Sequence, residues 1–157
     1  MKQYVARPGE LIIAKSPDLI TSMALGSSLG ICLYDDKNKV GGVVQSFYPH
    51  NPKNEDDCKY VDSAIRLLYQ KMLDRGAEAK YLSAKLVGGA RLFQLHIDGF
   101  QEDIGNHNVM SAYETLQALK IPIKNADVGD AFGRTFHFQL SDGIVLIETK
   151  QRITYHI

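Results

Sequence analysis

The stretch from Leu19 to Asp35 constrains the fold most, because it predicts two apolar strands joined by one short turn. The first apolar run ends at Leu25-Gly26-Ser27-Ser28, and the second begins directly after it as Leu29-Gly30-Ile31-Cys32-Leu33-Tyr34. Small residues between two such runs favour a tight turn. A strand-turn-strand can present a reactive side chain at the edge of a sheet. Ser28, the last residue of the turn, is therefore the first candidate nucleophile.

The size and charge of the chain limit what surrounds this turn. A chain of 157 residues with 45% hydrophobic and 23% charged residues can build one core, so we predict a single domain over residues 1–157. Its 18 basic residues balance its 18 acidic residues, which argues against a nucleic-acid partner.

The N-terminal residues, the longest apolar stretches and the cysteines do not point to export or a membrane. The N-terminal residues lack a signal-peptide pattern, and no apolar stretch approaches the ~18 residues of a membrane span. We predict a cytoplasmic protein without membrane insertion, in which Cys32 and Cys58 are reduced. Cys32 lies in an apolar strand pattern, so a small buried hydrophobe is favoured over a reactive thiol.

The rest of the chain predicts an α/β fold with a mixed β-sheet and helices packed on its faces. Further strands are expected at Glu10–Lys15, Val40–Tyr48, Lys80–Val87, Ile123–Val128, Thr135–Leu140 and Ile144–Thr149, with a turn at Ser141-Asp142-Gly143, and a last strand or a loose tail at Arg152–Ile157. Apolar periodicity predicts one helix over Tyr60–Arg75, stopped by Gly76, and a second capped by Asn106 and ended by Pro122. Between them, Pro49–Lys59 predicts a solvated loop that can overhang a site.

Two glycine pairs call for separate interpretations. Gly41-Gly42 indicates a bulge or a place where backbone or ligand approaches closely. Gly88-Gly89-Ala90 forms a turn whose backbone amides can bind an anion, but a role in close packing is favoured.

Several short motifs together resemble one protein family over nearly the whole chain. In order they are Leu25-Gly26-Ser27, Val40-Gly41-Gly42 with Pro49, Lys59-Tyr60-x-Asp62-x-Ala64, Gly88-Gly89-Ala90 with Phe93, Ile104-Gly105 with Asn108, and Gly129 with Gly133-Arg134. On these residues the chain is similar to the chemoreceptor glutamine deamidase family CheD, whose signature turn reads Leu-Gly-Ser-Cys. The resemblance implies an α/β/α sandwich similar to that of the cytotoxic necrotizing factor deamidases.

The resemblance also implies an activity, partners and a site. Members of the family hydrolyse selected chemoreceptor glutamines to glutamate with release of ammonia, and in many bacteria they bind the phosphatase CheC. They use a Cys in the turn, a His on the next strand and a Thr before the Cys; by position these fall on Ser28, Gln45 and Ser22. The residues that would shape the binding groove are Leu25, Gly26, Ser27, Gly88, Gly89, Ala90 and Phe93. A Gly-Gly pair of the family's later loop reads Gly129-Asp130 here.

These substitutions remove the chemistry that amide hydrolysis needs. A Cys near a base reaches the thiolate at neutral pH, whereas a Ser hydroxyl must pass its proton to a base during attack. Gln45 does not titrate, so it can act neither as general base nor as general acid. His50, the nearest histidine in sequence, is expected on the other face of the strand and beyond Pro49. No histidine has metal-ligand spacing to another His or Cys, so neither a metal nor another cofactor is predicted.

Three hypotheses follow. The first is a catalytically silent member of the CheD family that binds the cytoplasmic domain of a chemoreceptor, a CheC-like protein or another chemotaxis protein. The alternative is an active deamidase that uses Ser28 as nucleophile with a base that the sequence does not identify, so whether the chain is an enzyme stays open. The third is an α/β domain whose partner is unrelated to chemotaxis.

Overall fold

The computed structural model describes residues 1–91, 96–97, 100–101, 103–151 and 154–157. Sheet A contains, in spatial order, β1 (Gln3–Ala6), β3 (Leu19–Leu25), β10 (Arg134–Gln139), β11 (Val145–Thr149) and β12 (Thr154–His156). Sheet B contains β2 (Leu11–Lys15), β5 (Val40–Ser46), β4 (Leu29–Asp35), β6 (Leu82–Gly88) and β9 (Ile123–Val128). The remaining elements are the pair β7 (His96–Ile97) and β8 (Phe100–Gln101), the helices α1 (Val61–Asp74) and α2 (Ile104–Ala118), and a short 3-10 turn at Ala79–Tyr81.

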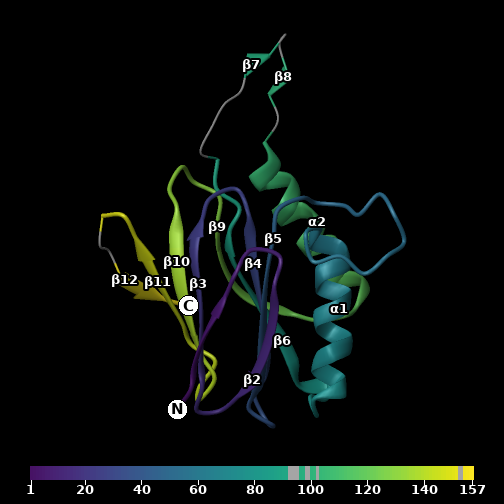
Figure 1. The fold of residues 1–157 in the computed structure, drawn as a ribbon, viewed down its shortest axis with the longest axis vertical. Coiled ribbons are helices and arrows are strands. Elements are labelled where there is room, and N and C mark those ends of the chain that lie inside the picture. Colours follow the sequence, from purple (N-terminus) through teal and green to yellow (C-terminus); the bar gives the residue numbers. More distant parts are fainter. Residues whose placement is uncertain (92–95, 98–99, 102, 152–153) are drawn as a thin grey trace.

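The two sheets face each other, and both described helices lie on the outer side of sheet B (Figure 1). Parallel and antiparallel pairs occur in each sheet, for example β1 with β3 and β10 with β3. The predicted α/β class, a mixed sheet with packed helices, is confirmed. The layer order differs from the α/β/α sandwich that the resemblance implies: within the described residues it is sheet, sheet, helices.

Strand β4 is buried on both faces of sheet B, which is the middle layer of the fold. All seven of its residues are buried. Leu29, Ile31 and Leu33 belong to the core under the helices, whereas Cys32 and Tyr34 belong to the core between the sheets. Since successive side chains of a strand point to opposite faces, an apolar run without polar alternation indicates burial on both faces.

Glycines on sheet B let the second sheet approach closely. A Cβ at Gly30 would lie 2.5 Å from the Phe136 ring, and one at Gly41 would lie 2.4 Å from Leu140 Cδ2. Gly42 faces the helices instead, where a Cβ would lie 2.7 Å from Leu68 Cδ1. The β4–β5 register is continuous through Gly41 and Gly42, so close approach is the correct interpretation of this pair and a bulge is not.

Most predicted elements are present with shifted ends. The second helix begins at Ile104 and its N-cap is Asp103, whose carboxylate accepts the Asn106 N–H at 3.0 Å; the prediction that Asn106 is the cap was wrong. Strand β12 resolves the alternative at the C-terminus in favour of a strand. Strand β1 was not predicted. That residues 1–157 form one domain stays a prediction.

None of the described helices is long and apolar enough to cross a membrane.

Asp35, at the end of β4, is expected to stabilise the fold in a pH-dependent way. Its buried carboxylate accepts the N–H groups of Lys37, Asn38 and Glu78 and the Asn38 side-chain amide, at 2.8–2.9 Å. Burial opposes ionisation, but these hydrogen bonds outweigh it and lower the pKa of Asp35. A lowered pKa contributes stability above the unfolded-state value of ~3.9, and that stability is lost as the pH falls through the folded-state pKa.

Asp35→Asn should therefore lower the free energy of unfolding by about 2 kcal/mol at neutral pH, with the difference shrinking in acid. Urea denaturation of the variant and the natural chain, from neutral pH into acid, measures the difference in the free energy of unfolding. The matched control is Asp36→Asn, whose side chain is 63% exposed and should change stability little. Equal losses in the two variants, or a difference that does not vary with pH, would contradict the assignment.

Candidate functional site

The turn between β3 and β4 is held in place by its carbonyl groups. The Gly26 carbonyl accepts the Ala90 N–H at 2.9 Å, and the Ser28 carbonyl accepts the Gly89 N–H at 2.9 Å. Asn108 of α2 donates from Nδ2 to the Ser27 carbonyl at 2.9 Å, and also to the Phe47 carbonyl. Three consecutive carbonyls are thus bound by the end of β6 and by α2, which fixes the turn and the Ser28 backbone.

The Gly88-Gly89-Ala90 segment is a packing surface for this turn. Gly88 has a φ of +112°, and a Cβ there would lie 2.5 Å from the Ser28 carbonyl oxygen. A Cβ on Gly105, at the start of α2, would lie 2.4 Å from the Ala90 carbonyl oxygen. Because the amides of Gly89 and Ala90 already donate to the turn, they are not available for an anion. The favoured role in close packing is confirmed.

The three positions singled out from the sequence form one hydrogen-bonded chain. Ser22 Oγ donates to Gln45 Oε1 at 3.0 Å, and Gln45 Nε2 donates to Ser28 Oγ at 3.0 Å. Ser22 lies on β3, Gln45 on β5 and Ser28 just before β4. Ser22 is fully buried, Gln45 is 2% exposed and Ser28 is 8% exposed. Three segments distant in sequence therefore place an amide between two hydroxyls.

The His137 side chain is engaged away from Ser28. His137 Nδ1 lies 2.8 Å from Thr21 Oγ1, and its Nε2 lies 3.5 Å from Glu148 Oε2. Thr21 and His137 alternate with the buried Ser22 and Phe136, so they lie on the outer face of sheet A, away from Ser28. Among the side chains that the structure describes, Gln45 is the hydrogen-bond partner of Ser28 Oγ, and it is not a base.

Cys32 does not offer a substitute nucleophile. It is 1% exposed in the core between the sheets. Burial raises the pKa of its thiol far above the ordinary value, and Lys85 opposes that rise only in part. The thiolate, which is the reactive form, is therefore disfavoured at neutral pH. The prediction of a small buried hydrophobe is confirmed.

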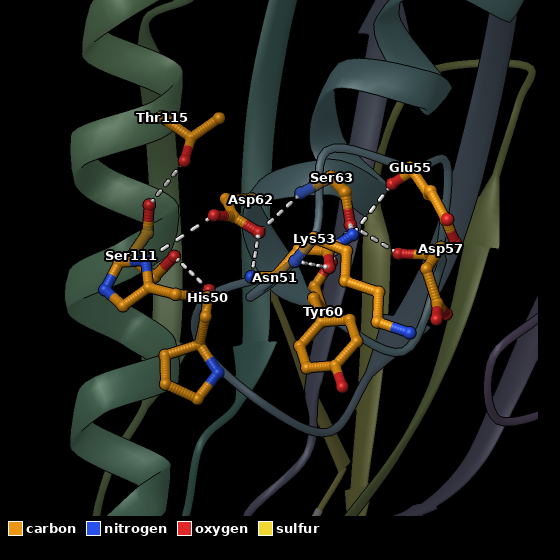
Figure 2. Close-up of polar contacts among 11 residues, drawn as sticks. His50, Asn51, Lys53, Glu55, Asp57, Tyr60, Asp62, Ser63, Ser111 and Thr115 are labelled. Carbon is orange, nitrogen blue, oxygen red and sulfur yellow. Dashed lines mark hydrogen bonds and ion pairs between the residues drawn. The ribbon is translucent and has the colours of Figure 1, made fainter.

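The Pro49–Lys59 loop is anchored to both helices, although residues 52–56 are exposed. Figure 2 shows Asp62 of α1 at its centre: Oδ1 accepts the N–H groups of Asn51 and Ser63, and His50 Nδ1 lies 3.6 Å from Oδ2. Ser111 of α2 donates to the Pro49 carbonyl. His50 is thus paired with α1, and it is not a hydrogen-bond partner of Ser28.

A cavity of about 590 Å³ lies beside the glycine turn. Its charged and polar lining includes Arg91, Asp103, Asn106 and Asp130. Asp130 has a φ of +55°, the left-handed conformation that a glycine adopts readily, so the Gly129-Asp130 pair keeps a glycine-like backbone. Phe93, the other residue predicted for the groove, lies outside the described residues. Across the described chain, His, Cys, Asp and Glu form no cluster that could hold a metal ion.

Two residues that support the site were not assigned these roles from the sequence. Asn108 is fully buried on the apolar side of α2. A polar residue on the apolar face of a predicted helix is a sequence signal for a buried hydrogen-bonding role. Arg134, 2% exposed, donates to Asp127 Oδ2 and to the Gly129 carbonyl, both at 2.9 Å, and so holds the loop that lines the cavity. Nothing in the sequence predicts that this arginine is buried.

A side chain on a fixed turn, hydrogen-bonded to a neighbouring strand and backed by a second hydroxyl, is the layout of a nucleophile, a base and an orienting group. The fold and site therefore define a two-sheet α/β protein in which a turn serine, a strand glutamine and a second strand serine form one hydrogen-bonded chain. Known proteins narrow this class. The sequence profile of the family described as CheD chemotactic sensory transduction matches residues 46–149, and the chain belongs to the CheD family.

Relatives in this family match the chain over most of its length. A protein named probable chemoreceptor glutamine deamidase CheD from Caldanaerobacter subterraneus subsp. tengcongensis is 40% identical and is matched over 95% of each chain. Proteins of the same name from Clostridium tetani and Oceanobacillus iheyensis are 38% and 40% identical, over 95% and 82% of this chain and 92% and 80% of theirs.

Proposed function

We propose that this chain is a catalytically silent CheD protein of the cytoplasm, which acts by binding the cytoplasmic domain of a chemoreceptor or a CheC-like protein. The observation that carries the proposal is the Ser22–Gln45–Ser28 chain of hydrogen bonds. It keeps the spatial layout of a catalytic triad but contains no group that titrates near neutral pH. Family membership supports the chemotaxis partner, since relatives bear the name chemoreceptor glutamine deamidase.

Amide hydrolysis requires a group that takes up and returns protons, and the Ser22–Gln45–Ser28 chain contains no such group. Attack by Ser28 requires that its proton move to a base, and release of ammonia requires that a proton be returned to the leaving nitrogen. The Gln45 amide can do neither. Loss of a nucleophile and base that act as a unit can lower a rate by about 10⁶, which an intact turn does not restore.

The test measures binding and chemistry on the same samples. Purified chain is titrated into cytoplasmic fragments of the chemoreceptors from its own organism, and into CheC from that organism, by calorimetry. Each mixture is then assayed for ammonia and for the conversion of glutamine to glutamate by mass spectrometry. We expect binding to at least one partner and no conversion.

Two results would overturn the proposal. Absence of binding to every partner at high micromolar concentration would remove the chemotaxis role and favour an unrelated partner. Conversion of glutamine that Ser28→Ala abolishes would show an active enzyme with Ser28 as nucleophile.

A further inference from the structure

The hydroxyl proton of Ser28 is not used inside the Ser22–Gln45–Ser28 hydrogen-bond chain, because the buried end of that chain fixes the orientation of the Gln45 amide. Ser22 is fully buried, and its hydroxyl has Gln45 Oε1 as its acceptor. With the Gln45 amide reversed, the Ser22 hydroxyl would face an NH₂ group and lose that acceptor inside the core, where an unpaired hydroxyl donor is unfavourable. The amide therefore turns Nε2 toward Ser28, and Ser28 Oγ accepts a hydrogen bond there.

The Ser28 hydroxyl can therefore donate its proton to a ligand. Within the described residues, no acceptor receives its hydroxyl proton, and the backbone N–H groups of Ser27 and Ser28 also have no acceptor. Peptide units are planar and trans, so each N–H points opposite to the carbonyl before it. The Ser27 N–H therefore points away from Ala90, and the Ser28 N–H away from Asn108, whose bonds occupy the Gly26 and Ser27 carbonyls.

We propose that this turn binds the side-chain carboxylate of a glutamate on the partner protein in preference to the carboxamide of a glutamine. The proposal rests on the proposed function and specifies what that docking site recognises. A carboxylate only accepts hydrogen bonds, so it matches the Ser28 hydroxyl and the turn amides. A carboxamide carries an NH₂ group that finds no acceptor among these donors, and its bonds lack the strengthening that an ionised acceptor gives.

Short-range donors, not the net charge of the surroundings, give this selectivity. Among the residues that the structure describes, the lining of the adjacent cavity has one cation, Arg91, and two carboxylates, Asp103 and Asp130. These charges do not sum to an attractive field for an anion. The chain as a whole has a formal net charge of zero. A preference for glutamate would therefore be lost when the turn loses its hydroxyl donor.

The experiment compares two forms of one chemoreceptor cytoplasmic fragment, which carry either glutamine or glutamate at the positions that CheD deamidases modify. We expect the glutamate form to bind the natural chain about tenfold more tightly, the effect of one hydrogen bond to a charged group. In Ser28→Ala the two affinities should differ by less than about threefold. The matched control is Ser141→Ala, which removes an exposed hydroxyl in the turn between β10 and β11 and should keep the full preference.

A second measurement does not depend on the receptor. N-acetylglutamate amide and N-acetylglutamine amide are titrated separately into the labelled chain at millimolar concentration, and the amide signals of Ser27 and Ser28 are followed by NMR. Larger shifts with the glutamate compound support the proposal. Equal or reversed preferences in either measurement overturn it. A fragment that fails to bind in both forms removes this chemoreceptor as the partner in the proposed function and leaves the NMR result to decide this inference.

Discussion

The double variant Ser28→Cys/Gln45→His is expected to convert glutamine to glutamate on a bound partner at least roughly 10²–10⁴ times faster than the natural chain. Ser28 Oγ and Gln45 Nε2 lie 3.0 Å apart, which is the reach that a nucleophile and its base require. Ser22 Oγ, 3.0 Å from the far end of the Gln45 amide, is placed to orient the imidazole. Ammonia release from receptor fragments, with the mass change from amide to acid, measures the gain.

Each single variant separates one part of this effect. Ser28→Cys alone supplies a better nucleophile without a base, and Gln45→His alone supplies a base for a weaker nucleophile, so each should gain far less than the pair. Adding Ser22→Ala to the double variant removes the orienting hydroxyl and should take back part of the gain. A double variant that folds, binds the fragment and releases no ammonia would show that the groove no longer presents glutamine to the turn.

The strand-turn-strand and the first helix could be predicted because local signals determine them. The turn at Gly26 interrupts two apolar runs, and the stripe of α1 repeats at helical spacing until Gly76. The site positions Ser22, Gln45 and Ser28 could be carried over by resemblance. Their hydrogen bonds could not, because Ser22 and Gln45 are 23 residues apart and meet only when the two sheets pack.

The division into two sheets depends on contacts that no local pattern records. Gly41 suggested a bulge or a close approach and Gly30 was given no role, yet both are where the aromatic side chains of β10 pack against sheet B. Strand β1 escaped prediction because it is short and largely exposed, and it is fixed by parallel pairing with β3. Asn108 donates to the Ser27 carbonyl, which is far from it in sequence, and Arg134 donates to the Gly129 carbonyl in an irregular loop. Residue type alone does not reveal either role.

Arg134→Met is expected to destabilise the protein by about 3 kcal/mol and to weaken partner binding. The guanidinium is buried, stacks over the Phe132 ring at 4.3 Å and donates to Asp127 and to the Gly129 carbonyl. Its removal leaves Asp127 with one remaining side-chain donor, the Tyr155 hydroxyl, and leaves a carbonyl of the loop without its partner. Urea denaturation of the variant and the natural chain measures the loss.

Arg134 also pairs with Leu25 across the β10–β3 register, next to the turn that carries Ser28. The loop it holds includes Gly129 and Asp130, which line the cavity. Destabilisation and weaker binding should therefore appear together in Arg134→Met. The control Arg66→Met replaces an exposed arginine on α1 and should change stability by less than about 0.5 kcal/mol. Removing a buried arginine that bonds a carboxylate and a carbonyl should destabilise the protein more than removing a solvent-exposed arginine. Equal losses of stability in the two variants would therefore show that the buried guanidinium does not hold this loop.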